Sequence, residues 1–272
     1  MKHLVLTASF GDRPFKKFTI DSQQKYADRI GADFRCVEEY DVDEKFNQIP
    51  LGRGGNTAYL IKLLVIQDAL REYDRVIWFD DTCVVSTDTP NLFNTVPVEL
   101  FAAHNEGILD WVLADQQTKS MYERNGFPNI ITSQNYFNTG VMVVSKAHSP
   151  LFEDNIIIDL GVKGHFKNAY PEQTYLNYMI ARHRIGFFAL PSIFNRMTVN
   201  LEEFEGERVN YETMKPRQTA LARDLSSYGF LNADNTKVGQ LNGAYIYHIT
   251  SMYSADRRYN LIQKLHQIKV DK

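Results

Sequence analysis

The chain has 272 residues, of which 44% are hydrophobic, 12% aromatic and 23% charged. This balance is typical of a globular protein and excludes a collagen, a coiled coil and wholesale disorder. Its 30 basic and 33 acidic residues give a net charge of −3, which argues against a duplex nucleic-acid binder. The two cysteines, Cys36 and Cys83, are too few for a disulfide framework or a zinc cluster, and we expect both to be reduced and buried.

Runs of strand length alternate with runs of helical length through the first hundred residues. The predicted strands are Leu4–Thr7, Phe34–Val37 and Arg75–Phe79, and the predicted helices are Phe15–Ile30 and Thr57–Leu70. Such an alternation predicts a mainly parallel sheet with helices on both faces.

The second half is less regular. Its predicted strands are Leu100–Ala103, Phe137–Val144, Phe187–Leu190 and Tyr245–Ile249, and its predicted helices are Asp110–Met121, Pro171–Ala181 and Ala255–Ile268. Residues 200–242 are polar and rich in loop formers, which makes them a candidate lid or wall of a binding site. No linker or repeat divides the chain, so we expect one domain.

No targeting segment or membrane span is evident from the sequence. The first apolar run, Leu4–Leu6, is too short for a signal peptide. No stretch approaches the roughly 18 apolar residues of a membrane span. We therefore expect a cytoplasmic protein without an integral membrane segment.

The sharpest chemical feature is a buried strand that ends in acidic residues, Asp80-Asp81, followed by Thr82. In open α/β sheets, ligands bind beyond the carboxyl ends of strands. Two adjacent carboxylates repel each other unless a cation or hydrogen bonds offset their charge, and a hard divalent ion such as Mg²⁺ or Mn²⁺ would do so. The alternative is a simple turn, in which these residues cap a loop or helix.

Three other polar positions interrupt or follow apolar runs. Asn138 and Gly140 lie within a predicted strand, where a glycine suggests close approach of the backbone to a ligand. Gln173 follows Glu172 at a predicted helix start, and His248 ends a late apolar run. An imidazole there could complete a metal site, although a lone histidine at a strand end is more often a structural hydrogen-bonding group.

Six short motifs occur in order along the chain. They are the segment Arg75–Thr82, Asp88 with Leu92-Phe93, the segment Tyr136–Met142, Glu172-Gln173 with Leu176-Asn177, Leu190-Pro191 with Phe194-Asn195, and His248. Together they resemble the motifs of GT-A-fold glycosyltransferases, most closely the family 8 type of retaining nucleotide-sugar transferases. The likeness covers most of the chain and implies an α/β, Rossmann-like fold: a mixed, mainly parallel sheet flanked by helices.

The resemblance also implies how the chain is organised. It predicts a single domain over residues 1–272, with a nucleotide-binding half over 1–105. The acceptor-side half and the C-terminal helix would occupy 106–272.

The resemblance assigns roles to positions that match the family's motifs. Nucleotide and donor-sugar contacts would come from Thr7, Ala8, Phe10, Lys62, Asp80, Asp81, Asn138, Gly140 and Gln173. Within that set, Gln173 would lie beside the anomeric carbon. Lys62 has a competing interpretation as a lysine that extends its stem over an apolar helix face.

The resemblance also implies catalytic and metal-binding sets. The catalytic residues would be Gln173, Glu172 and Asp80, with Glu172 binding sugar hydroxyls. The metal ligands would be Asp80, Asp81, Thr82 and His248, and the ion Mn²⁺ or Mg²⁺.

Two departures from the family's pattern stand out. Thr82 occupies the position of the second aspartate of the Asp-x-Asp motif. Asp81 could replace that ligand, Thr82 could serve as a weaker one, or the metal could be lost. The Lys-Pro-Trp tail that follows the family's histidine is also absent, and Arg257 or Arg258 could supply its charge to a leaving diphosphate.

The resemblance implies transfer of a hexose from a nucleotide-diphosphate sugar, UDP-linked by expectation, to a hydroxyl of a glycan, protein or small-molecule acceptor. It implies retention of configuration, and because no carboxylate is an evident covalent nucleophile, we favour front-face attack. Two alternatives remain open. A nucleotidyltransferase should show a Gly-rich basic loop after the first strand, whereas Thr7–Arg13 holds one Gly and one Arg. A non-catalytic nucleotide-sugar-binding or scaffold protein of the same fold would explain Thr82.

Overall fold

A computed structural model describes ten parts of the chain: residues 1–42, 44, 49, 57–105, 128, 130–131, 135–162, 170–197, 244–249 and 255–271. The side chains of residues 57, 162, 197 and 255–257 are not among them. Three sequence expectations therefore fall outside the described residues: the helix Asp110–Met121, the wall over 200–242 and the side chain of Arg257.

A six-stranded sheet forms the centre of the fold, in the order β2-β1-β3-β6-β5-β7. Its strands are β1 (His3–Ala8), β2 (Asp33–Val37), β3 (Arg75–Phe79), β5 (Phe101–Asn105), β6 (Phe137–Ser145) and β7 (Phe187–Leu190). Only β6 runs antiparallel to its neighbours, and the other five strands share one direction. The mixed, mainly parallel sheet predicted from the sequence is confirmed.

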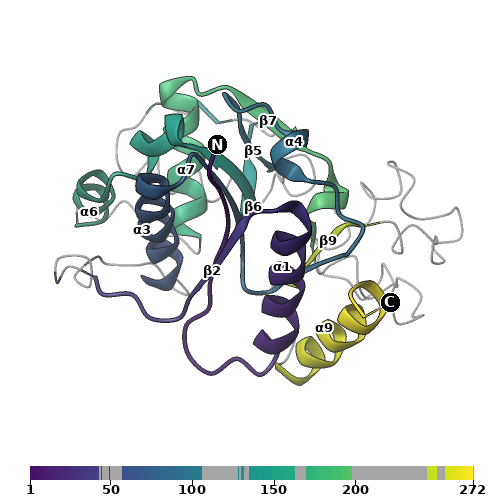
Figure 1. The fold of residues 1–272 in the computed structure, drawn as a ribbon. Coiled ribbons are helices and arrows are strands. Elements are labelled where there is room, and N and C mark those ends of the chain that lie inside the picture. The colour runs from purple at the N-terminus through teal and green to yellow at the C-terminus, as the bar shows by residue number, and fades with distance from the viewer. Residues whose placement is uncertain are drawn as a thin grey trace, which may run out of the picture.

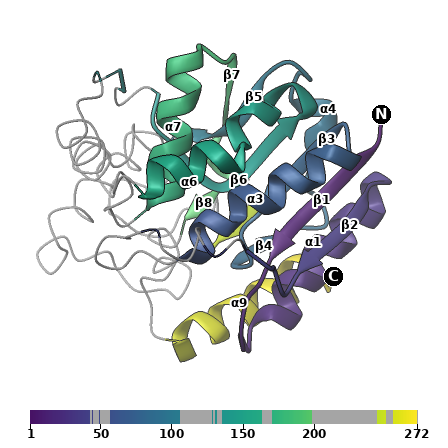
Figure 2. The same ribbon diagram turned by 90° about the vertical axis from the view of Figure 1, so that its left-hand side faces the viewer.

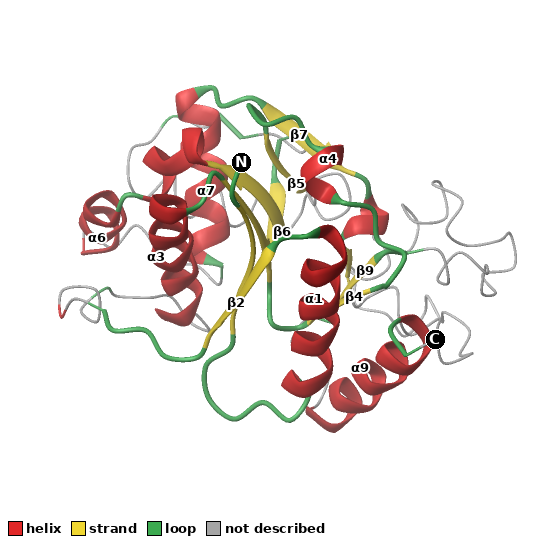
Figure 3. Cartoon of the chain, viewed as in Figure 1, coloured by secondary structure: helices red, strands yellow, loops and turns green. Residues whose placement is uncertain are grey.

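Helices cover both faces of this sheet (Figure 1). One face carries α3 (Thr57–Glu72), the 3₁₀ helix η1 (Lys146–Phe152), α6 (Asp154–Val162) and α7 (Pro171–His183). The other carries α1 (Lys16–Ile30) and the short α4 (Leu92–Thr95). Figure 3 shows the strands running between the two groups of helices. The C-terminal helix α9 (Ala255–Lys269) packs against α1, as Figure 2 shows.

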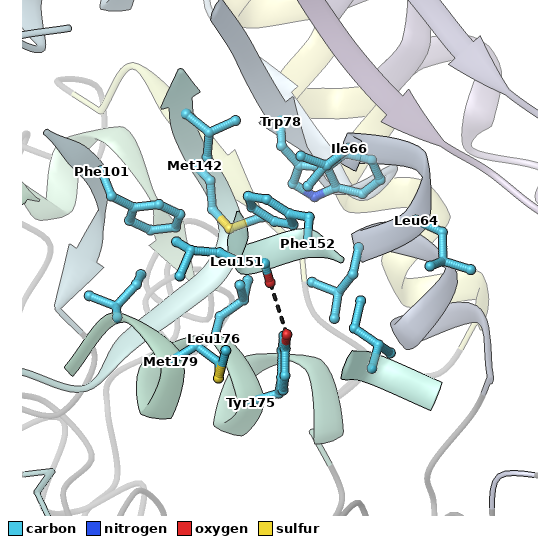
Figure 4. Close-up of a cluster of buried hydrophobic side chains, with 14 of the residues drawn as sticks. Leu64, Ile66, Trp78, Phe101, Met142, Leu151, Phe152, Tyr175, Leu176 and Met179 are labelled. Carbon is cyan, nitrogen blue, oxygen red and sulfur yellow. Dashed lines mark hydrogen bonds between the residues drawn. The ribbon is translucent and has the colours of Figure 1, made fainter. Parts of the chain in front are cut away.

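The alternation of side chains along the strands explains these two layers. Leu4 and Leu6 of β1 point into one hydrophobic cluster, and Val5 between them points into another. Figure 4 shows part of the first cluster, in which Trp78 of β3 and Phe101 of β5 lie above α7. Both layers are therefore apolar on the sheet side, as a sheet buried on two faces requires.

A second sheet contains three short strands, the first of which follows β3 in the chain. It has the order β4-β9-β8, with β4 (Cys83–Val85), β9 (Ile246–His248) and β8 (Arg196–Met197). The 3₁₀ helix η2 (Ser192–Phe194) precedes β8. Sequence analysis predicted β9 as Tyr245–Ile249 and missed β4 and β8, because two or three residues carry no readable periodicity.

Most other elements lie where the sequence predicts them, with ends that differ by one or two residues. The pairing of β5 and β6 shifts register between Ala103 and His104, opposite the segment that contains Gly140. The expectation of two buried thiols is half wrong: both cysteines are free, but Cys36 is only partly buried. In the part of the chain that the structure describes, no helix is both long and apolar enough to cross a membrane.

Candidate active site

Polar side chains gather at the edge of the sheet where β1 and β3 end and β6 begins. Asp80 follows β3, and Asn138 and Gly140 lie in the first half of β6. Glu172 and Gln173 occupy the first turn of α7, which begins at Pro171. Because β6 runs opposite to β3, its start meets the end of β3 at this edge. The topology thus brings together residues far apart in sequence.

Asp80 is the centre of this arrangement. Its Oδ1 accepts a hydrogen bond from Trp78 Nε1 at 2.8 Å and lies 2.8 Å from Lys62 Nζ. Its Oδ2 lies 3.5 Å from His248 Nε2. Burial favours the neutral carboxyl, but the charge of Lys62 outweighs it and holds the pKa of Asp80 well below its usual value. Asp80 is therefore an ionised carboxylate.

Lys62 is buried between two carboxylates. Its Nζ lies 3.5 Å from Glu172 Oε1 as well as 2.8 Å from Asp80 Oδ1, and it donates to Thr139 O at 3.3 Å. Burial favours the neutral amine, but Asp80 and Glu172 outweigh it and raise the pKa of Lys62. The side chain therefore carries its charge inside the site rather than extending to solvent, which excludes the competing surface interpretation of Lys62.

Glu172 has one satisfied and one unsatisfied oxygen. Oε1 accepts a hydrogen bond from Thr139 Oγ1 at 3.3 Å, whereas Oε2 is buried and finds no partner among the described residues. Burial raises the pKa of Glu172, with Lys62 acting in the opposite direction. An unpaired buried carboxylate oxygen is costly, so this atom is suited to accept a hydrogen bond from a bound hydroxyl.

Asp81 points to other partners. Its Oδ2 accepts a hydrogen bond from Ser9 Oγ at 2.9 Å and lies 3.2 Å from Arg13 Nε. Burial raises the pKa of Asp81, while Arg13 and Ser9 lower it. Among the described residues, Asp80, Asp81 and His248 do not form a group of three metal ligands within 4.8 Å of one another. Thr82 is buried beside them.

A chain of side-chain hydrogen bonds connects α7 with His248. Gln173 Oε1 accepts from Asn138 Nδ2 at 3.2 Å, and Asn138 Oδ1 accepts from Asn195 Nδ2 at 2.9 Å. Asn195 Oδ1 then lies 3.0 Å from His248 Nδ1. All four side chains are buried.

Gly140 makes room for the imidazole of His248. A Cβ at this position would lie 2.2 Å from His248 Cε1 and 2.4 Å from His248 Nδ1. The close approach expected of this glycine is therefore occupied by a side chain of the protein itself, and any larger residue would displace His248.

The residues expected to contact the nucleotide lie at the end of β1 and in the loop that follows it. Thr7 is buried, and its Oγ1 has no hydrogen-bond partner among the described residues. Ala8 and Phe10 are partly exposed. A pocket of about 770 Å³ opens beside Phe10. Its lining also includes Arg13, Phe15, Lys17, Arg258 and Tyr259.

Arg258 brings the C-terminal helix to this pocket. Its guanidinium lies 5.7 Å from the ring centre of Phe15, and its buried Nε has no partner among the described residues. Burial and then the charge of Arg13 lower the pKa of Arg258. Three basic side chains, Arg13, Lys17 and Arg258, outnumber the one acidic side chain of the lining, Asp12, which favours an anionic ligand.

A different group of potential metal ligands occurs where α9 meets α1. His266 Nε2 lies 2.6 Å from Asp21 Oδ2, and His266 Nδ1 lies 3.0 Å from Asp271 Oδ2. Lys25 Nζ lies 2.9 Å from Asp21 Oδ2. Both ring nitrogens of His266 are thus hydrogen bonded to carboxylates, and Lys25 also forms an ion pair with Asp271. This group therefore joins the two helices.

Sequence reasoning missed several residues that shape the site. Trp78 lies two residues before Asp80, on the same face of the strand, and this spacing was a readable signal. Asn195 belonged to a recognised motif but had no role assigned. The pairing of Ser9 and Arg13 with Asp81 depends on the loop after β1, which periodicity does not describe.

Several solved structures of other proteins are similar to this chain. No family model matches the chain, and no curated protein matches it. Solved structures do match. The first is a glycosyltransferase involved in glycosylation of the major capsid of PBCV-1, with a TM-score of 0.56, 13% identity, and coverage of 97% of this chain and 100% of that one.

Two further glycosyltransferases are similar in structure. The galactosyltransferase LgtC, in complex with donor and acceptor sugar analogues, has a TM-score of 0.55, 15% identity, and coverage of 96% of this chain and 95% of that one. GlyE of Streptococcus pneumoniae has a TM-score of 0.50, 13% identity, and coverage of 100% and 62%. The chain therefore has the GT-A fold of these glycosyltransferases, and the resemblance predicted from its sequence is confirmed at the level of the fold.

Proposed function

We propose that this protein transfers a hexose from a nucleoside-diphosphate sugar to an acceptor hydroxyl. The observation that carries the proposal is the convergence of Asp80, Lys62, Glu172, Gln173 and His248 at the carboxyl edge of the sheet. In α/β folds this edge is where ligands bind. The donor and acceptor sugar analogues in the LgtC complex support the same substrate classes here.

Two of the residues present, Asp80 and His248, suit a divalent cation such as Mn²⁺ or Mg²⁺. Asp80 Oδ2 and His248 Nε2 face each other, and carboxylate oxygen and imidazole nitrogen are suitable ligands. Asp81 is engaged by Ser9 and Arg13, so we assign it to holding the loop after β1. When bound, the ion would stabilise the negative charge that develops on the leaving diphosphate. Phosphate oxygens commonly complete such a coordination shell.

Glu172 and Gln173 would hold the sugar. The unpaired Oε2 of Glu172 would accept a hydrogen bond from a sugar hydroxyl. Gln173 would lie beside the anomeric carbon, fixed by Thr139 N at 3.3 Å and by its donation to Tyr136 Oη at 3.2 Å. A structure of LgtC with an active-site glutamine replaced by glutamate supports a glutamine in such a site. Gly140 would admit the imidazole of His248 against the strand.

Lys62 would stabilise the leaving group and fix the two acidic side chains. Its ammonium lies between Asp80 and Glu172, which keeps both carboxylates in place without mutual repulsion. A preorganised cation of this kind stabilises negative charge without reorganisation during the reaction.

The nucleotide would occupy the end of β1 and the neighbouring pocket. Thr7, Ala8 and Phe10 would contact the base and ribose, and Arg258 would attract the diphosphate. In this assignment residues 1–105 form the nucleotide-binding half, and the acceptor-side half over 106–272 supplies the sugar contacts and His248. UDP as the carrier and retention by front-face attack complete the proposal.

The proposal is tested by incubating the protein with a panel of nucleotide sugars and Mn²⁺ and measuring release of the nucleoside diphosphate. We expect turnover with one donor and its loss in Asp80→Ala. Asp154→Asn, on the exposed start of α6, serves as the matched control. NMR of the product reports whether the anomeric configuration is retained. No turnover with any donor in the wild type would contradict the proposal.

One observation favours a second candidate, a non-catalytic protein that binds a nucleotide sugar. Thr82 replaces a carboxylate, and the carboxylate of Asp81 is already paired with Arg13. Donor binding by calorimetry without any release of nucleoside diphosphate would favour this candidate over the transferase.

A further inference from the structure

A relay of three amide side chains runs through the core of the site from Gln173 to His248. Its members are Gln173, Asn138 and Asn195, and each is hydrogen bonded to the next. An amide side chain can present either its oxygen or its nitrogen to a neighbour. Which atom each amide presents must therefore be decided by hydrogen-bonding groups outside the three amides.

Two backbone N–H groups of β6 fix that direction. Gly140 N donates to Asn138 Oδ1 at 2.8 Å, and Thr139 N donates to Gln173 Oε1 at 3.3 Å. A backbone N–H cannot accept, so each of these amide atoms must be an oxygen. Asn138 therefore presents its nitrogen to Gln173 and its oxygen to Asn195.

The direction then passes through Asn195 to the imidazole. Because Asn138 presents an oxygen, Asn195 turns its nitrogen toward it, and the oxygen of Asn195 faces His248 Nδ1 at 3.0 Å. A carbonyl oxygen only accepts, so Nδ1 carries the proton. In the neutral ring, Nε2 then presents its lone pair to Asp80 Oδ2 at 3.5 Å.

We propose that Asn195 is a positioning residue that holds His248 in the Nδ1–H tautomer and thereby presents Nε2 as a cation ligand beside Asp80. The role of His248 as a cation ligand rests on the proposed function, whereas the tautomer follows from the hydrogen bonds alone. Imidazoles that bind metal typically donate their other N–H to an oxygen that fixes the tautomer, and loss of such a partner costs about 10- to 100-fold in metal affinity.

The small sheet brings the segments that carry these residues together. In β9, His248 pairs with Cys83 of β4 on one side and with Met197 of β8 on the other. Cys83 follows Asp80 by three residues, and Asn195 directly precedes β8. Asp80 and Asn195 thus lie just before the two strands that pair with the strand of His248.

The tautomer of His248 is measured directly in the metal-free protein by two-bond ¹H–¹⁵N NMR at about pH 8, where an ordinary imidazole is neutral. The His248→Gln variant identifies the signal. We expect the Nδ1–H tautomer in the wild type. Asn195→Asp keeps the acceptor for Nδ1 and loses only the donor to Asn138, so it should retain this tautomer. Asn195→Leu, which removes the acceptor, should shift the ring to the Nε2–H tautomer, with its proton directed at Asp80.

Cation binding gives the second measurement, using Mn²⁺ titrated into the protein with UDP present. Asn195→Leu should bind Mn²⁺ at least about tenfold more weakly than the wild type, and Asn195→Asp should rescue most of the loss. Circular dichroism and thermal unfolding establish that the variants are folded. If Asn195→Leu does not fold, the wild-type tautomer and the Asn195→Asp variant still decide the question.

The outcomes separate this inference from the proposed function. An Nε2–H or doubly protonated His248 in the wild type would overturn the inference even if the protein transfers sugar, as would an unchanged tautomer in Asn195→Leu. An Nδ1–H tautomer that depends on residue 195, in a protein that turns over no nucleotide sugar, would overturn the transferase and leave the positioning role of Asn195 intact.

Discussion

Replacing Lys62 with methionine tests how the two buried acidic side chains are held together. Methionine retains an unbranched apolar side chain but removes the ammonium that lies 2.8 Å from Asp80 and 3.5 Å from Glu172. Removing one partner of a buried ion pair costs about 3–5 kcal/mol, because the remaining charge stays buried. The side chain of Asp80 is 26% exposed, so we place the loss near the lower end, about 3 kcal/mol.

The loss depends on pH in a defined direction. Burial raises the pKa of Glu172, and Lys62 opposes that rise, so the substitution raises this pKa further. A carboxyl whose pKa is higher in the folded than in the unfolded state, where it is about 4.3, loses stability as pH rises through the folded value. The deficit of Lys62→Met should therefore be larger at pH 8 than at pH 5.

Urea-induced unfolding at the two pH values measures the effect. Lys146→Met, at an exposed lysine of η1, is the matched control and should change stability by less than about 0.5 kcal/mol. The double variant Lys62→Met/Glu172→Gln should recover part of the loss, because it removes the second buried charge. A Lys62→Met protein as stable as the control at both pH values would refute the reasoning.

Three further predictions concern the nucleotide pocket and the core. Arg258→Met should weaken binding of a nucleoside diphosphate about tenfold by calorimetry, whereas Lys264→Met on the same helix should leave it unchanged. Burial lowers the pKa of His104 to about 4. Between pH 7 and pH 4, His104 therefore takes up a proton in the unfolded chain but stays mostly neutral in the folded chain. The free energy of unfolding, measured with urea, should fall between pH 7 and pH 4 by about 3 kcal/mol less in His104→Gln than in the wild type. Equal decreases in the two proteins would contradict the argument. Tyr175→Phe removes the buried hydrogen bond of 3.0 Å to Leu151 O, which is the dashed line in Figure 4. It should lower the free energy of unfolding by about 1 kcal/mol without affecting nucleotide binding.

Much of the fold is readable from the sequence because most central strands contain a run of consecutive apolar residues. Arg75–Phe79 and Phe187–Leu190 are strands with the predicted bounds. The second sheet was not predictable, since β8 has two residues and β4 three, and each depends on pairing with β9. Tertiary contacts alone create these strands.

The proximity of some candidate residues was predictable from the sequence, and the pairing of their side chains was not. The order of motifs placed Asp80 and His248 together, and the structure separates their side chains by 3.5 Å. The direction of Asp81 toward Arg13 was not foreseen, because it depends on where the loop after β1 places a side chain. The relay through Asn195 was equally hidden, since it follows from hydrogen-bond donors on the backbone of β6.

Calorimetric titration of UDP and other nucleoside diphosphates, with and without Mn²⁺, tests the central claim most directly. The wild type should bind one of them in a Mn²⁺-dependent manner, and Asp80→Asn should bind it roughly a hundredfold more weakly while remaining folded. Equal affinity in the two proteins, or no binding of any nucleoside diphosphate by the wild type, would contradict the account.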